Sequence, residues 1–172
     1  MKKLLTAVLV TTALLTATYA YSDDATPRPR KATKEIAINP AFHKIVAGNN
    51  IQLVLIQGAY KASVIINGDK NSIELVNVSM DKGVLTITAK KNLKGTNVKI
   101  YVPVTTLTSL DVAGDASVTT QGIVKLDDLK VIVQDGSLVN LHVIGNMHIE
   151  PGANCEFVYE TYRKAKVLDE QE

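Results

Sequence analysis

Short runs in which apolar and polar residues alternate dominate the chain after residue 36. Successive side chains of a β-strand point to opposite faces, so an apolar residue at every second position is typical of a strand with one buried face. Four runs show this period: Ile51, Leu53 and Leu55; Val64 and Ile66; Leu85, Ile87 and Ala89; and Val98, Ile100 and Val102. The pattern predicts an all-β fold with very little helix.

Turn-forming residues separate these runs. Gly58, the Asn-Gly-Asp segment 67–69, the Asp-Lys-Gly segment 81–83 and residues 94–97 supply backbone that tolerates positive φ, which suits tight turns. Residues 71–80 fit either one helical turn or a strand, and the alternation of Val76, Val78 and Met80 favours the strand.

From Leu107 onward the sequence resembles itself. Residues 107–112 align with 126–131, residues 115–118 align with 135–138, and residues 141–149 form a fainter third copy. Repeats of about 20 residues are too small to bury their own apolar faces, so they indicate stacked coils that share one core. We therefore expect short strands that lead into a right-handed β-helix or β-solenoid-like stack, with Gly, Asp, Asn and Ser at its corners. Phe157, Tyr159 and Tyr162 then predict a final strand that closes the end of the stack, before a charged tail over residues 161–172.

The N-terminus has the pattern of a secretory signal peptide. Lys2 and Lys3 precede the apolar run 4–15, and a small-residue segment ends at Ala20. The apolar run is too short for a transmembrane anchor. Residues 21–35 are polar and include Pro27 and Pro29, so we expect a flexible linker there, followed by a single β-rich domain over residues 36–160.

The formal net charge of +2 for 172 residues does not indicate an acidic partner. Lys2 and Lys3 account for the whole excess, because residues 1–20 contain no acid. A near-neutral mature chain lacks the clustered positive charge with which nucleic-acid-binding proteins neutralise phosphates. Its remaining charge is local: Lys82, Lys90, Lys91, Lys94 and Lys99 form a lysine-rich stretch, whereas residues 111–135 hold five aspartates. We expect the lysines to be solvated strand edges rather than a polarised binding surface.

Cys155 is the only cysteine, so no intramolecular disulfide can form. An intermolecular disulfide or a reactive thiol is conceivable, but a small buried hydrophobic residue is the favoured interpretation.

Few residues suggest chemistry. Asp115 and Asp135 would stack at a corner if the repeat register holds, and paired carboxylates could catalyse glycoside hydrolysis. His142, His148 and Glu150 would share a face of an unbroken strand and suit zinc, although Gly145 and Asn146 should break it. Asp111, Asp115, Asp127 and Asp128 offer oxygen ligands for calcium without a calcium-loop spacing. Corner aspartates commonly bond their own turn, so we assign no catalytic, cofactor or metal residue.

Five segments together resemble a known family: Ile51–Gly58, Val64–Asn71, Asp81–Ile87, Val98–Pro103 and Leu107–Val118. In this order they are similar to the head GIN domain family of exported bacterial proteins, which is named for putative auto-transporter adhesins. The resemblance covers roughly residues 40–150. It implies an all-β fold of β-helical type, display in the cell envelope and a binding role, and it carries over no catalytic residue.

The leading functional hypothesis is an exported, non-enzymatic, adhesin-like module that contacts an envelope component or an external surface, in the periplasm, at the cell surface or outside the cell. Two alternatives stay open. One is a small β-helical enzyme that acts on polysaccharide, and the other is a structural envelope protein that self-associates through its strand edges. A lectin that stacks sugars on aromatic platforms is disfavoured, because the chain contains no Trp.

The signal-peptide assignment predicts cleavage after Ala20, because small side chains fit the cleavage site. Intact-mass measurement on protein recovered from the cell envelope should give a chain that begins at Tyr21. Recovery of envelope protein that retains residues 1–20 would contradict the assignment.

Overall fold

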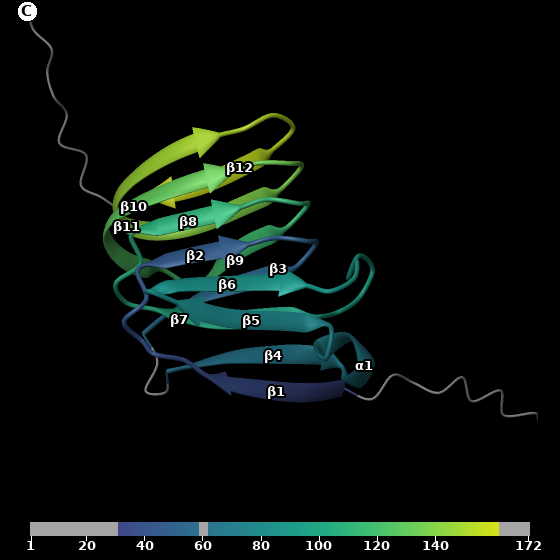
Figure 1. Ribbon diagram of the computed structural model, residues 1–172. Helices are drawn as coiled ribbons and strands as arrows, with labels where there is room; N and C mark the ends of the chain where they lie inside the picture. The colour runs from purple at the N-terminus through teal and green to yellow at the C-terminus, as the bar shows by residue number, and fades with distance from the viewer. Residues whose placement is uncertain (1–30, 59–61, 162–172) are drawn as a thin grey trace, which may run out of the picture.

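The computed structural model describes residues 31–58 and 62–161 and shows an all-β protein, as expected (Figure 1). One four-residue helix, α1 (Lys70–Ile73), is the only helix within this part of the chain. The strands are β1 (Lys31–Ala37), β2 (Lys44–Ala47), β3 (Gln52–Gln57), β4 (Ser63–Asp69), β5 (Val76–Asp81), β6 (Val84–Ala89), β7 (Lys99–Val104), β8 (Ser109–Val112), β9 (Ser117–Gln121), β10 (Val124–Val133), β11 (Leu138–Pro151) and β12 (Glu156–Thr161).

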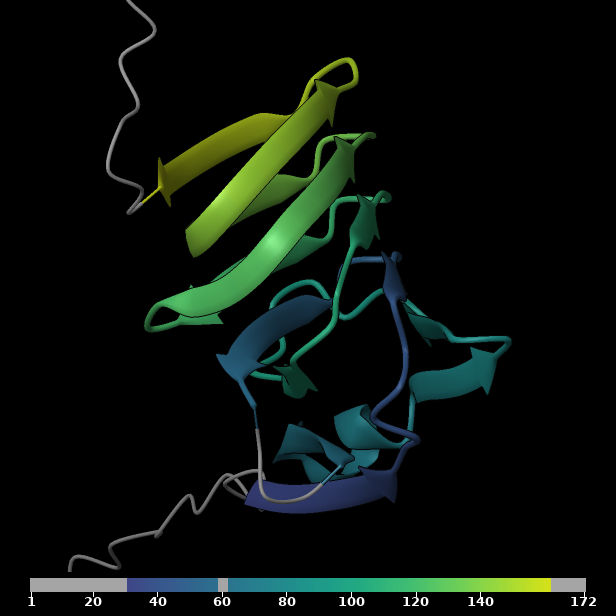
Figure 2. The same cartoon turned by 90° about the vertical axis from the view of Figure 1, so that its left-hand side faces the viewer.

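All the strands belong to one sheet that folds back on itself. Its order is β1-β4-β7-β3-β9-β11-β10-β8-β2-β6-β5, and β12 pairs with β11 beside this path. Two facing rows result, which we call walls (Figures 1 and 2). The first wall contains β6, β2, β8, β10 and residues 146–151 of β11. The second wall contains β7, β3, β9, residues 138–143 of β11, and β12.

Within each wall, strands of successive levels pair in parallel. We call a first-wall strand, the corner after it and the following second-wall strand a rung. The β2–β3 rung lies between the β6–β7 and β8–β9 levels, because β2 pairs with both β6 and β8 while β3 pairs with both β7 and β9. The order of levels therefore differs from the order in the sequence, which the repeat pattern did not reveal.

The predicted repeat is present, but its register differs. Leu110 lies opposite Val131 rather than Leu129, and Ser117 lies opposite Leu138 rather than Ser137. The first difference is two residues, which keeps the same side chains facing inward, so both pairings of Leu110 fit the apolar pattern. The second is one residue and places Val139, rather than Leu138, on the inner face opposite Val118. The third copy spans the bend of β11: Leu141 lies in the second wall, and Met147 lies in the first wall opposite Leu129.

Strand β11 crosses between the walls at Gly145. This residue has φ 143°, and a Cβ there would lie 1.5 Å from the carbonyl oxygen of Leu126 on the neighbouring strand. The pairing of β10 with β11 shifts register between Lys125 and Asp128 at the same place. Only glycine fits this bend without displacing backbone, because any larger residue would overlap Leu126.

The core lies between the walls and is built from the inward positions of the alternating strands. Ile45 and Leu110 of the first wall and Leu53, Val118 and Leu141 of the second wall are at most 1% exposed. They belong to one continuous apolar cluster. Because each level contributes only a few of these side chains, the core depends on stacking.

The two ends of the stack are closed differently. At the lower end in Figure 1, β5 pairs antiparallel with β6. The second wall is extended there by β4, which pairs antiparallel with β7, and by β1, which pairs antiparallel with β4. At the upper end, Phe157 and Tyr159 of β12 face the core side with ring centroids 5.3 Å apart. The predicted final strand is therefore present, although Tyr159 is half exposed; Tyr162 lies outside the described residues.

Two local expectations need correction. Residues 31–35 were assigned to the flexible linker, but they form most of β1, in which Lys31 lies opposite Asp69 of β4. Backbone pairing with β4 orders this polar segment, in which Ala32 is the only residue of 31–35 that packs against the core. Residues 71–80 contain both of the alternatives rather than one: α1 ends at Ile73, and β5 begins at Val76.

The residue before each second-wall strand points inward, and these residues are Ile51, Val98, Ala116, Ser137 and Cys155. Ser137 is fully buried, and its hydroxyl has no hydrogen-bond partner within the described chain. A buried hydroxyl without a partner costs about 1–3 kcal/mol of desolvation.

Replacing Ser137 by alanine should therefore raise the free energy of unfolding by about 1 kcal/mol, because the unpartnered hydroxyl is removed at little loss of packing. Urea unfolding monitored by circular dichroism measures the change. Ser117→Ala, at a half-buried position on the outer face of β9, is the control and should change stability by less than about 0.5 kcal/mol. A less stable Ser137→Ala protein would show that the hydroxyl is bonded.

Candidate binding surface

The corners between the walls hold residues with positive φ, as their Gly, Asp and Asn content predicted. Asn49 and Asn50, Gly114 and Asp115, and Asp135 and Gly136 have φ between 53° and 70°. Successive corners are joined through the backbone: the N–H of Asn50 donates to the carbonyl of Gly114 (2.8 Å), and the N–H of Asp115 donates to that of Asp135 (2.9 Å). Asn, Asp and Gly are the residues that adopt this conformation most readily.

Asp115 and Asp135 are thus corner residues of adjacent rungs, as the repeat predicted. The carboxylate of Asp115, however, lies over Gly136, where a Cβ would be 2.4 Å from Asp115 Oδ1. Both residues are exposed, and their left-handed backbone accounts for the presence of aspartate at both positions.

The structure does not bring together the three residues considered for zinc. His142 lies in the second wall, where its Nδ1 is 3.4 Å from Glu160 Oε2. His148 and Glu150 lie beyond the bend in the first wall, with His148 Nε2 3.6 Å from Glu150 Oε1. The bend at Gly145 separates them, in agreement with the break expected there.

The aspartates considered for calcium are also dispersed. Asp111 forms a salt bridge of 2.5 Å with Lys44, and Asp128 accepts a hydrogen bond of 2.7 Å from the side-chain amide of Asn146. Within residues 31–58 and 62–161, no group of three or more His, Cys, Asp and Glu side chains could hold a metal ion.

Cys155 is partly buried against the core at the uppermost corner. Its Sγ donates to the carbonyl oxygen of Gly152 at 3.1 Å. It occupies the inward corner position that Ala116 and Ser137 occupy in the levels below, which agrees with a small packed side chain.

The outer face of the first wall is charged, and its charges pair with one another. Lys44 on β2 pairs with Asp111 on β8, and Lys130 on β10 pairs with Glu150 on β11 at 3.0 Å. Neighbouring rungs therefore neutralise each other across this face.

The outer face of the second wall is different, because its three central strands carry no Lys, Arg, Asp or Glu. The outward side chains of β3, β9 and residues 138–143 of β11 are Gln52, Val54, Ile56, Ser117, Thr119, Gln121, Leu138, Asn140 and His142. Pairing aligns Val54, Thr119 and Asn140 in one row across the strands, and Tyr101 of β7 continues that row. We call this surface the uncharged face.

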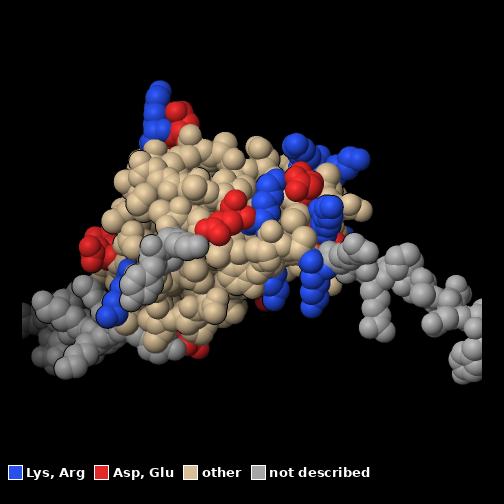
Figure 3. Space-filling view, turned by 90° about the horizontal axis from the view of Figure 1, so that it is seen from below, with Lys and Arg blue, Asp and Glu red and all other residues tan. Residues whose placement is uncertain are grey.

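Several exposed lysines lie at the lower end of the molecule. Seen from below, lysine side chains gather toward one end of the underside, where acidic side chains stand beside some of them (Figure 3). Lys31 on β1, Lys70 on α1 and Lys99 on β7 are exposed there, on elements joined by backbone pairing or directly connected. Sequence reasoning missed Lys31, which it placed in the linker, because residues 31–35 are polar apart from Ala32 and show no apolar alternation.

The family match decides the classification. The profile of the family described as "Putative auto-transporter adhesin, head GIN domain" matches residues 41–150. The chain belongs to this family. The resemblance found in the sequence is therefore confirmed, and the head GIN family supplies the description "adhesin". No curated protein matches the chain.

Solved structures of putative adhesins share the fold of this head GIN domain. One from Parabacteroides merdae is 19% identical with a TM-score of 0.60, and matches 76% of this chain and 56% of its own. One from Parabacteroides distasonis is also 19% identical, with a TM-score of 0.57 over 71% of this chain and 56% of its own. A third structure, described as a putative lipid binding protein from Parabacteroides distasonis, has 19% identity and a TM-score of 0.53 over 74% of this chain and 59% of its own.

The chain thus spans little more than half the length of these structures. At this level of identity, the likeness concerns the fold alone. Helix α1, the one helix in the described part of this head GIN domain, lacks the length and apolar character needed to cross a membrane.

The corner geometry predicts that two substitutions at Asp135 differ in their effect on stability. Asp135→Asn should keep the free energy of unfolding within about 0.5 kcal/mol, whereas Asp135→Ala should lower it by about 1 kcal/mol, since alanine adopts positive φ less readily. Urea unfolding measures both, with Gln134→Ala at the exposed neighbouring residue as control. A loss with asparagine equal to that with alanine would show that the carboxylate itself is needed.

Proposed function

We propose that this head GIN protein is exported through its N-terminal signal peptide and acts as a non-enzymatic, adhesin-like binding module in the cell envelope or outside the cell. Its partner would be a protein or glycan of the envelope or of an external surface. The family description and the folds of the similar structures support an adhesin-like role.

In this proposal the strands form a right-handed stack of the β-solenoid type, preceded by a short linker that ends before β1. The parallel pairing of successive levels in both walls supports the stack. The turn role of Asp115 and Asp135 supports a non-enzymatic module, because left-handed corners account for both residues.

The uncharged face is the observation that carries the proposal. Adjacent strands lie about 4.8 Å apart, so Val54, Thr119 and Asn140 form a row of regularly spaced side chains. Charged side chains are depleted in the cores of protein interfaces, because their desolvation opposes binding. The outer face of the first wall is less suited to an interface core, because it carries the charged pairs Lys44–Asp111 and Lys130–Glu150.

Beads coated with the exported chain test the adhesin role on two probes, immobilised mucin and purified bacterial cell wall. We expect retention above that of albumin-coated beads on at least one probe. Thr119→Arg should lower retention about tenfold, because it places a charge in the middle of the uncharged face.

Thr86→Arg is the matched control, since Thr86 is a half-buried outward residue of β6 in the first wall. It should change retention by less than about twofold. Retention at the albumin level on both probes, or equal losses with the two variants, would overturn the proposal.

A further inference from the structure

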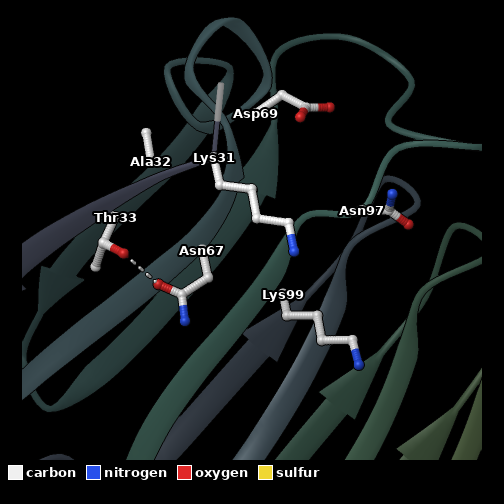
Figure 4. A pocket seen from close by; sticks show the side chains of 8 residues that line it. Lys31, Ala32, Thr33, Asn67, Asp69, Asn97 and Lys99 are labelled. Carbon is white, nitrogen blue, oxygen red and sulfur yellow. Dashed lines mark hydrogen bonds between the residues drawn. The ribbon is translucent and has the colours of Figure 1, made fainter. Parts of the chain in front are cut away.

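A groove of about 890 Å³, lined mainly by polar and charged residues, lies at the lower end of the second wall, across β1, β4 and β7 (Figure 4). It adjoins the uncharged face on the side of β7. Its volume falls within the range of about 300–1,000 Å³ that is usual for ligand sites.

The sheet register explains why the groove is polar. Thr33 and Lys99 lie on either side of Asn67, and Lys31 lies opposite Asp69, two residues along the same strands. Alternate residues of a strand share one face, so these side chains form two neighbouring rows on the same surface. Asn97, two residues before Lys99, completes the lining.

The groove presents more positive than negative charge. Within the described part of the chain, neither Lys31 nor Lys99 forms a salt bridge, whereas Lys34, Lys44 and Lys130 do. The side chain of Lys31 extends from β1 toward the strand that carries Lys99, and the carboxylate of Asp69 points away from both ammonium groups (Figure 4). Two cations are therefore available to a ligand.

The side-chain amide of Asn67 is a third hydrogen-bond donor in the groove. Thr33 Oγ1 donates to Asn67 Oδ1 at 2.9 Å, which engages the acceptor of the amide and leaves its N–H groups for other partners (Figure 4). Two ammonium groups and an amide N–H group suit a carboxylate or phosphate group, because hydrogen bonds between charged partners are the strongest kind.

We propose that this groove binds an acidic group, a carboxylate or a phosphate, of an anionic polysaccharide. The proposal rests on the proposed function and names the class of ligand. Thr33 and Asn97 flank the lysines with groups that bond sugar hydroxyls. Ala32 is the only apolar side chain in the lining, so the groove has nothing to insert into a lipid bilayer. Its two cations beside one carboxylate are too few to hold a nucleic-acid duplex.

The test measures binding of soluble probes to the full exported chain by isothermal titration at low salt. The probes are an oligogalacturonate, which carries carboxylates, a phosphomannan, which is a polysaccharide that carries phosphates, and vesicles that contain phosphatidylglycerol. Binding of either soluble polymer supports the proposal and identifies the acidic group. Binding to the vesicles alone, or to none of the probes, overturns it.

Two double variants with the same net charge separate the groove from general electrostatics. Lys31→Gln with Lys99→Gln should weaken binding about tenfold or more, because both cations of the groove are lost. Lys82→Asn with Lys125→Gln removes two exposed lysines outside this groove and should weaken binding less than about threefold. Equal losses in the two variants would overturn the assignment to the groove.

The bead assay keeps the two proposals apart. Loss of polymer binding in the groove variant with bead adhesion unchanged would leave the uncharged face as the adhesive surface. If the exported chain binds neither soluble polymer but its beads still adhere, the groove proposal alone is wrong.

Discussion

Each rung of this protein depends on the rungs above and below it. A single rung contributes only a few inward side chains, such as Leu110 and Val118, and leaves the N–H and C=O groups of its strands without partners. Parallel pairing between levels satisfies the backbone and buries those side chains in the same step. The corners have to stack at the same spacing, which the positive φ of Asn50, Asp115 and Asp135 permits.

This dependence explains what the sequence could predict. Alternation shows which side chains of a strand face inward, so the strands around Leu53, Ile66, Leu85 and Ile100 were found. Alternation does not show which residue of the next level lies opposite. Leu110 could pair with Leu129 or with Val131 without changing the core face, and the structure pairs it with Val131.

The order in which the levels stack could not be predicted from local sequence patterns, for a related reason. Strand β2 lies between β6 and β8, which both follow it at a distance in the chain, and the apolar alternation of β2 does not identify either neighbour. The ordering of β1 was missed because polar residues such as Lys31 and Thr33 obtain their order from backbone pairing with β4. The groove was missed together with β1, because its lining comes from β1, β4 and the start of β7, which only the fold brings together.

The outer faces follow from the same stacking. Parallel levels bring side chains of successive rungs into rows, so opposite charges on neighbouring rungs pair, as Lys44 and Asp111 do. Where the aligned residues of successive rungs are all uncharged, as Thr119 and Asn140 are, the whole row is uncharged. Where the levels end, antiparallel strands replace the rungs. Lys99 then has Asn67 opposite it, and the carboxylate of Asp69, which lies opposite Lys31, points away from both lysines. Unpaired cations are thus a consequence of ending the stack with β1 and β4, and the end of the sheet is where this fold leaves charge available for a ligand.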